Sequence, residues 1–346
     1  MRSLGCDVEA RPTSLIVALM RKLLSILVPT ALIVISVNPA FAQVDRWIAE
    51  GWRTDFTRIE FDLNEIRSII PRDNIPAIDN PLFIPVAEEA ELVDREPVIG
   101  LIINGDARAY PLRIMMWHEI ANDVVGGTPV VVTYCPLCNT AIAFEAEIDG
   151  RTLDFGTSGK LRFSDLVMYD RQTQSWWQQF SGRGLVGEYA GTMLPLVPTR
   201  LMSWGEFKSD HPEGQVLVPN DPLMRQYWRN PYTGYDTAIA PFLYDGPLPT
   251  GMAAMERVVL VRTDPLAAYT LSLIEELGEI ETNGVTIRWN PGQATALGAA
   301  RIEEGRLVGG VEVFRLTDGI EVPVVHDVTF AFVVNAFEPQ LEIRTE

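Results

Sequence analysis

Apolar residues in this chain come mainly in short runs that end at turn-forming residues, which is typical of β-strands. Residues 98–110 and 141–155 each contain two such runs, joined at Asn104-Gly105 and at Asp149-Gly150. Asn-Gly and Asp-Gly favour the tight type I′ turn that connects two antiparallel strands. The pattern therefore predicts two β-hairpins, and an apolar run over residues 130–134 predicts a buried strand between them.

Helical character is predicted for residues 63–70, 111–124 and 204–211. Pro111 suits the first turn of a helix, because the N–H that proline lacks has no partner there, and Gly126-Gly127 would end that helix. Strands still outnumber helices. We expect an α+β fold that is strand-rich and mainly antiparallel.

The two halves of the chain also contain similar sequence segments. Glu96-Pro97-Val98-Ile99-Gly100-Leu101 is followed by a similar Glu256-Arg257-Val258-Val259-Leu260-Val261, and Ala109-Tyr110-Pro111-Leu112 by Ala268-Tyr269-Thr270-Leu271. Similarity at this separation predicts two related units of ordinary domain size, the second degenerate. The predicted parts are an upstream extension with a signal peptide (1–42), a lead-in segment (43–92), a first unit (93–220), a bridge rich in Pro, Gly and Tyr (221–251) and the second unit (252–346).

The N-terminal region has the features of an export signal. Met20-Arg21-Lys22 is basic, residues 23–37 are apolar, and Ala40-Phe41-Ala42 fits a cleavage site before Gln43. An uncleaved anchor is the alternative, and translation could start at Met1 or at Met20. We expect a periplasmic or extracellular protein with no stable membrane span after cleavage, since no second stretch reaches spanning length.

Composition limits the partners. The chain has 46 acidic and 28 basic residues and a formal charge of −18. Such a surface repels nucleic acid and anionic lipid, so we expect neither as a partner. A redox partner or a small ligand is compatible with this charge.

Cys135 and Cys138 carry the main chemical signal. After cleavage they would be the two cysteines left, because Cys6 lies in the removed segment. A Cys-x-x-Cys pair suits a reversible disulfide, half of a metal site or a structural staple. Because the pair follows a predicted strand rather than beginning a helix, a thioredoxin-like fold is not expected.

The sequence predicts that the second unit keeps the loop without the thiols. If Pro291 is aligned with Pro136 and Thr295-Ala296 with Thr140-Ala141, Asn290 and Gln293 replace the two cysteines. A loop that tolerates this loss favours a functional role for the sulfurs in the first unit.

His118 and Asp165 are further candidates for catalysis beside Cys135 and Cys138. A histidine near a thiol can carry a proton or stabilise a thiolate, and Asp165 could act as an acid or base or could cap a turn. In an alternative interpretation Cys135, Cys138 and His118 bind copper or haem iron, and no other cofactor is expected.

The chain resembles the bacterial domain-of-unknown-function 3179 family. The motifs that carry the resemblance are Gly105-Asp106-Ala107-Arg108-Ala109-Tyr110-Pro111-Leu112, Trp117-His118-Glu119-Ile120, Thr133-Tyr134-Cys135-Pro136-Leu137-Cys138, Ser164-Asp165-Leu166-Val167-Met168-Tyr169-Asp170-Arg171, Ser175-Trp176-Trp177 and Trp204-Gly205-Glu206-Phe207. Members of that family catalogued as selenoproteins would imply redox chemistry at the cysteine motif. Three functions therefore remain open: thiol-disulfide redox chemistry, metal or haem binding, and a ligand-binding or interaction module with a structural disulfide.

Overall fold

The computed structural model describes residues 39–346, and its compact unit spans Gln43–Glu346. Cys6 and the apolar core of the predicted export signal lie outside the described residues. The predicted cleavage point before Gln43 falls within helix α2 (Pro39–Ala49). In this part of the chain no helix is long and apolar enough to cross a membrane.

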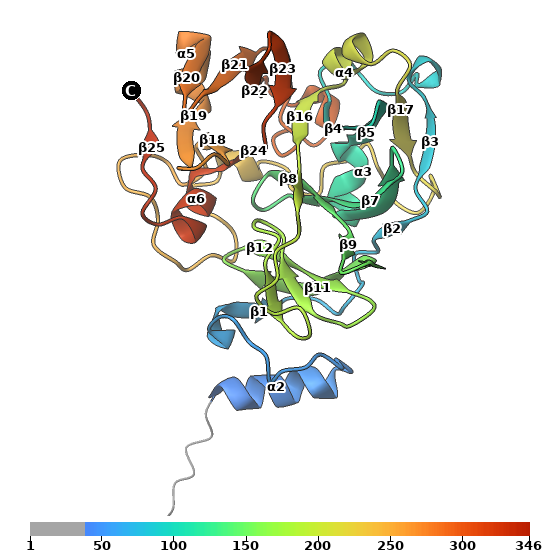
Figure 1. Cartoon of the computed structure of the whole chain (residues 1–346), viewed down its shortest axis with the longest axis vertical. Helices are drawn as coiled ribbons and strands as arrows, with labels where there is room; N and C mark the ends of the chain where they lie inside the picture. Colours follow the sequence, from blue (N-terminus) through green and yellow to red (C-terminus); the bar gives the residue numbers. More distant parts are fainter. Residues whose placement is uncertain (1–38) are drawn as a thin grey trace, which may run out of the picture. The chain divides into compact units, whose positions relative to one another are not determined.

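Short antiparallel strands dominate the structure (Figure 1), which confirms the predicted strand-rich α+β class. Three sheets combine strands of the first unit with one strand each from the lead-in segment. One has the order β16 (Thr199–Ser203), β4 (Pro97–Ile103), β5 (Asp106–Pro111), β17 (Gln215–Val218), β3 (Leu82–Pro85). A second has the order β15 (Leu196–Val197), β8 (Thr140–Glu145), β7 (Thr128–Cys135), β6 (Ile120–Val125), β2 (Ile78–Asp79). A third has the order β1 (Ile66–Ser68), β11 (Phe155–Arg162), β12 (Asp165–Asp170), β13 (Trp176–Gln178), β14 (Gly184–Val186), and β9 (Glu147–Ile148) pairs with β10 (Arg151–Thr152).

The second unit contributes two four-stranded sheets. Their orders are β24 (His326–Phe330), β18 (Arg257–Val261), β19 (Ala267–Thr270), β25 (Ile343–Arg344), and β20 (Glu279–Thr282), β21 (Val285–Asn290), β22 (Gly310–Thr317), β23 (Ile320–Pro323). The remaining helices are α3 (Leu112–His118), α4 (Trp204–Asp210), α5 (Leu271–Leu277) and α6 (Ala331–Phe337), with 3-10 turns η1 (Leu63–Glu65), η2 (Val86–Glu88), η3 (Tyr235–Thr237) and η4 (Ile302–Glu304).

The same connectivity occurs twice. Strands β4 and β5 form a hairpin, α3 follows β5, β16 pairs with the free edge of β4, and β17 runs parallel to β5. Strands β18, β19, β24 and β25 repeat this arrangement, with α5 after β19 and α6 after β24 where α4 follows β16. The internal similarity in the sequence therefore reflects a repeated strand topology.

Both turns form where the Asn-Gly and Asp-Gly pairs predict them, joining β4 to β5 and β9 to β10. The second hairpin is shorter than expected, because only residues 147–148 and 151–152 pair in it, whereas residues 141–145 pair with β7. The helix expected over 204–211 is α4, capped by the Ser203 hydroxyl, which accepts from the Glu206 N–H at 3.2 Å. Its cap explains why this short polar segment is helical.

Two predicted helices are wrong in extent. The stretch 63–70 forms η1 and then β1, which pairs with β11. The stretch 111–124 is helical only to His118, and its second half is β6, paired with β7. In both places hydrogen bonding to a distant strand overrides local helix propensity.

The cysteine loop and its counterpart in the second unit differ in length. Asn290 ends β21 as Cys135 ends β7, but it pairs with Gly310 across residues 291–309, whereas Cys135 pairs with Thr140. Thr295-Ala296 therefore does not begin the next strand as Thr140-Ala141 does, and that part of the alignment is wrong. An insertion in the second unit accounts for the difference.

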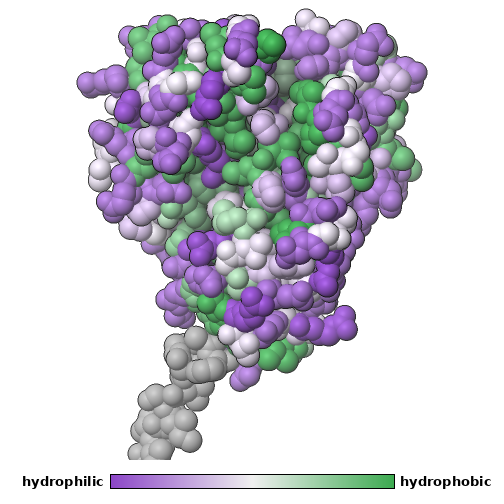
Figure 2. Space-filling model, in the orientation of Figure 1, coloured by the Kyte–Doolittle hydropathy of each residue, from purple (hydrophilic) through white to green (hydrophobic). Residues whose placement is uncertain are grey.

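The two units share their hydrophobic cores. One buried cluster contains both Val132 and Ile287, and another contains both Cys138 and Phe332. On the face in Figure 2, hydrophilic residues cover most of the margins and hydrophobic residues gather nearer the middle. The cysteine turn is therefore packed between the two units.

Candidate functional site

The two cysteines lie at a tight turn between adjacent strands. Cys135 is the last residue of β7, the N–H of Cys138 bonds the carbonyl oxygen of Cys135 at 3.2 Å, and β8 begins at Thr140. Asn139 completes the reversal with φ of 54°, a conformation that asparagine tolerates better than most residues. The pair therefore sits in a strand-turn-strand setting and lacks the helix N-terminus that lowers a thiol pKa in thioredoxin-like proteins.

Asp165 joins the cysteines in a buried group of three. One ligand atom from each of Cys135, Cys138 and Asp165 lies within 4.8 Å of the others. Cys135 is 2% exposed, and Cys138 and Asp165 are fully buried, with both thiols free. Asp165 is about thirty positions from the cysteines in the sequence, but it is the first residue of β12, and the start of that strand lies next to the cysteine turn.

The Asp165 carboxylate is held through one oxygen. Its Oδ1 accepts from Gln178 Nε2 at 2.5 Å and from the Phe180 N–H at 3.0 Å. Its Oδ2 is buried and has no hydrogen-bond partner among the described residues. Burying a charged carboxylate oxygen without a hydrogen-bond partner costs free energy, which favours the protonated form. Oδ2 is therefore the oxygen available to take a proton from a neighbouring sulfur.

Burial sets the proton affinities in this group. It raises the pKa of the Cys135 thiol, an effect that a hydrogen bond from Cys138 partly opposes. It raises the pKa of Cys138 well above its ordinary value, and the proximity of Cys135 raises it further. Burial also raises the pKa of Asp165 to about 7, although Gln178 and Phe180 favour its charged form. Cys135 is thus the thiol that ionises more readily, beside a carboxyl group suited to accept its proton.

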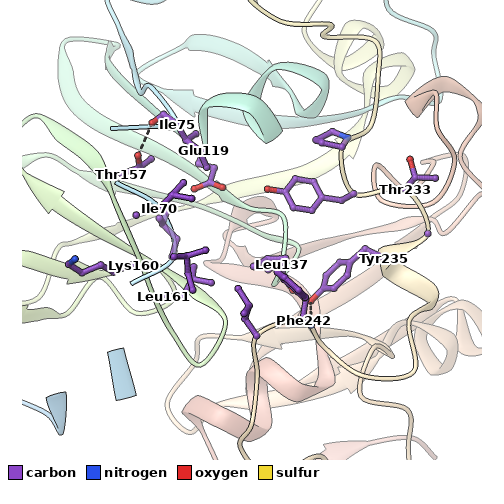
Figure 3. Close-up of a pocket in the computed structure, with 17 residues that line it drawn as sticks. Ile70, Ile75, Glu119, Leu137, Thr157, Lys160, Leu161, Thr233, Tyr235 and Phe242 are labelled. Carbon is purple, nitrogen blue, oxygen red and sulfur yellow. Dashed lines mark hydrogen bonds between the residues drawn. The ribbon is translucent and has the colours of Figure 1, made fainter. Parts of the chain in front are cut away.

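Glu119 is a fourth acidic group near the site, and the sequence did not single it out as a functional residue. It caps α3 with φ of 60°, and its N–H bonds the carbonyl oxygen of Met115 at 2.6 Å. Burial, with Asp165 as a further cause, raises the pKa of Glu119 to about 8. Its carboxyl group has no hydrogen bond to another described residue and points into a cavity (Figure 3).

This cavity, which we name the Glu119 pocket, has a volume of about 510 Å³. In Figure 3 Ile70, Thr157 and Leu161 lie on one side of it and Leu137 and Tyr235 on the other. Its other lining residues are Ile69, Ile75, Gly159, Lys160, Leu166, Pro231, Tyr232, Thr233, Gly234, Phe242 and Leu243. The volume and the largely apolar lining are those of a site for a small organic molecule.

The pocket adjoins the cysteine turn. Leu137, between the two cysteines, and Leu166, next to Asp165, both line it. The hydroxyl of Tyr235, from the predicted bridge, donates to the carbonyl oxygen of Leu137 at 3.0 Å. The bridge therefore supplies one wall of the pocket and fixes the turn that carries the sulfurs.

His118 is engaged elsewhere. Its Nδ1 contacts the Pro76 carbonyl oxygen at 2.7 Å, its Nε2 contacts the Tyr227 hydroxyl at 2.8 Å, and its ring stacks on that of Tyr227. Burial lowers the pKa of His118. Both ring nitrogens are thus used to join α3 to the lead-in segment and the bridge, and His118 is not a member of the group of three.

The donor set differs from the one expected for a metal site. Two thiolates and the Asp165 carboxylate would suit Zn²⁺, which takes sulfur, nitrogen and oxygen donors, but they supply three of its usual four ligands. His211 and His326 line another cavity, between the two units, and do not belong to this group.

Glu119, Tyr235 and Thr329, whose hydroxyl donates to the Cys138 carbonyl oxygen, were not predicted as site residues. Glu119 had one available signal, since it follows His118 in the Trp-His-Glu-Ile motif. Tyr235 and Thr329 have no such signal in the sequence, because each contacts the cysteine turn from a position about a hundred residues or more away along the chain.

The chain matches the family model described as a protein of unknown function (DUF3179) over residues 72–341. No curated protein and no solved structure matches it. The matched region includes the cysteine turn, Asp165, Glu119 and nearly all of both units. The chain therefore belongs to the DUF3179 family.

Proposed function

We propose that this protein is a thiol redox protein in which Cys135 and Cys138 cycle between a dithiol and a disulfide. One observation carries the proposal: both sulfurs and a carboxyl oxygen of Asp165 lie within 4.8 Å of one another. A structural staple does not need a carboxyl group with a free oxygen, whereas a reacting thiol needs a proton acceptor. The export signal expected from the sequence would place the pair where disulfides can persist.

Exchange with a disulfide shows the role of each group. Cys135 transfers its thiol proton to Asp165, and its thiolate attacks one sulfur of the partner disulfide and expels the other as a thiolate. The expelled thiolate takes the proton from Asp165, which then accepts the proton of Cys138. The Cys138 thiolate attacks the Cys135 sulfur and releases the second partner thiolate, which takes up that proton. Two S–H bonds and one partner S–S bond break, the Cys135–Cys138 bond forms, and the partner leaves with two electrons and two protons.

Redox titration tests the proposal. The Cys6→Ser variant, in which the pair is the only source of thiols, is equilibrated with mixtures of reduced and oxidised glutathione. It is then denatured in acid, alkylated and weighed by mass spectrometry. We expect one reversible transition in which two thiols are lost together, and no such transition after Cys135→Ser or Cys138→Ser is added. Thiols that stay reduced in every mixture, or a disulfide that the folded protein never releases, would contradict redox cycling.

Metal analysis of the same reduced preparations addresses the alternative use of this group. Stoichiometric zinc or copper that blocks alkylation of both cysteines would contradict redox cycling and support metal binding. Metal-free protein with two reactive thiols supports the proposal.

A further inference from the structure

The Glu119 pocket contains hydrogen-bond donors without acceptors. Within residues 39–346 neither the Glu119 carboxyl group nor the Tyr232 hydroxyl bonds another protein group, and both residues line the pocket. Burial raises the pKa of Tyr232, and the nearby charge of Glu119 raises it further. At neutral pH both groups carry their protons, so the pocket offers neutral donors to a ligand with an acceptor oxygen.

The pocket has little to attract a charged cofactor. Among residues 39–346, Lys160 is the one basic residue that lines it, and its ammonium group is occupied by Glu50 at 3.2 Å and Ser68 at 3.1 Å. That ammonium group also lies over the rings of Trp47, Trp52 and Trp176. A phosphate-bearing nucleotide would therefore lack a free counter-charge here, whereas a neutral apolar molecule would bury its surface against isoleucine, leucine and phenylalanine side chains.

The sulfurs are better placed for a small ligand in this pocket than for a protein partner. Cys135 and Cys138 are 2% and 0% exposed, so a protein disulfide could not reach them without movement of the turn. Leu137 belongs to that turn and also forms part of the pocket wall. A molecule held beside Glu119 therefore lies in a pocket that shares a wall, Leu137, with the turn that carries both sulfurs.

From these observations we infer that the Glu119 pocket binds a quinone, which accepts the electrons of the Cys135–Cys138 pair. This inference rests on the proposed redox function and names its electron acceptor. Two S–H bonds break, one S–S bond forms, and two electrons pass to the quinone ring. The two protons reach its two oxygens and convert both C=O groups to C–OH, so that the product is a hydroquinone. Glu119 and Tyr232 hold the quinone by donating hydrogen bonds to a carbonyl oxygen.

Duroquinone is a suitable probe, because its ring is fully substituted and has no open position to which a thiol could add. Binding is measured first by fluorescence titration of the Cys6→Ser, Cys135→Ser, Cys138→Ser triple variant, which cannot react. We expect saturable binding that Glu119→Leu weakens about tenfold, as the loss of a buried hydrogen bond should. Glu119→Gln retains a neutral hydrogen-bond donor, so its affinity for duroquinone should stay within about threefold of that of the triple variant. Leu161→Trp fills the pocket away from the cysteines and should abolish binding, whereas Glu147→Gln, at an exposed position of β9 outside the pocket, should have no effect.

Electron transfer is measured second, by mixing reduced Cys6→Ser protein with duroquinone without oxygen. We expect one hydroquinone per disulfide formed, and a rate that falls about tenfold in Glu119→Leu and is lost in Leu161→Trp. A pair that cycles with glutathione but does not reduce duroquinone would overturn this inference and leave the redox proposal standing. A pair oxidised by neither reagent would overturn both. Equal binding or equal rates in the wild type, Glu119→Leu and Leu161→Trp would also overturn it.

Discussion

The Thr329 hydroxyl donates a hydrogen bond of 2.9 Å to the carbonyl oxygen of Cys138 and so ties the cysteine turn to β24 of the second unit. Next to it, Asn139 Nδ2 donates to the carbonyl oxygen of Val328 at 3.2 Å. The second unit has no cysteines, but these contacts give it a direct structural role at the site. The second unit therefore helps to hold the cysteine turn in place.

Replacement of Thr329 should weaken this support. Thr329→Val keeps the shape of the side chain but leaves the buried Cys138 carbonyl oxygen without that partner, which should cost about 1–2 kcal/mol of unfolding free energy. The midpoint of the glutathione titration should also shift, because the turn must close to form the disulfide. Urea unfolding and the titration measure the two effects. Thr317→Val, on the exposed end of β22, is the control, and equal behaviour of the two variants would show that the contact has no role.

Asp165→Asn should slow oxidation of the dithiol. Asparagine can keep the bonds from Gln178 and Phe180 to Oδ1 but cannot accept the Cys135 proton, so we expect a loss of at least about 10²-fold in rate at pH 7. In the wild type the rate should rise as pH increases through about 7, the pKa to which burial raises Asp165. The oxidation rate of the variant should show no rise near pH 7 and should increase only at the higher pH at which the thiols themselves ionise. Stopped-flow measurement of the oxidation rate from pH 5 to 9 gives both profiles. If Asp165→Asn still showed the rise in rate near pH 7, a group other than Asp165 would be responsible for it.

Stability should fall as pH rises, because of Asp165 and Glu119. Burial raises their pKa values to about 7 and about 8, from 3.8 and 4.5. Between about pH 4 and pH 8 the unfolded chain therefore releases protons that the folded chain retains, which favours unfolding. Each group contributes a slope of up to about 1.4 kcal/mol per pH unit within its own window.

Asp165→Asn and Glu119→Gln should each flatten this dependence, and urea unfolding at pH 5, 6, 7 and 8 measures it. Glu147→Gln, with an exposed carboxylate, should keep the wild-type slope. If both buried variants kept it as well, their carboxyl groups would have ordinary pKa values in the folded protein.

Trp47→Ala should destabilise the whole compact unit. Trp47 is fully buried, its ring meets that of Trp176 edge to face at 4.7 Å, and its Nε1 donates to Ser68 Oγ at 3.1 Å. Truncation of a buried tryptophan typically costs about 3–5 kcal/mol. Trp228→Ala, at a residue that is 48% exposed, should cost far less in the same thermal and urea unfolding experiments. A small effect of Trp47→Ala would show that the segment just after the predicted cleavage site is dispensable for folding.

Local sequence determined the features that depend on a few neighbouring residues. The Asn104-Gly105 and Asp149-Gly150 turns predicted both hairpins, and the apolar run before Cys135 predicted a strand that carries the cysteines into a turn. These features follow from turn chemistry and periodicity, which act over short distances. They also identified Cys135 and Cys138 as the chemically distinctive pair.

Tertiary structure decided what surrounds the pair. Pairing with β7 converted the end of a predicted helix into β6 and left Glu119 at a left-handed cap that points into the pocket. Packing of β12 behind the turn placed Asp165 at the sulfurs and left His118 bonded to Pro76 and Tyr227. These outcomes depend on contacts between distant segments and on pKa values that burial sets, and neither is encoded in a local motif.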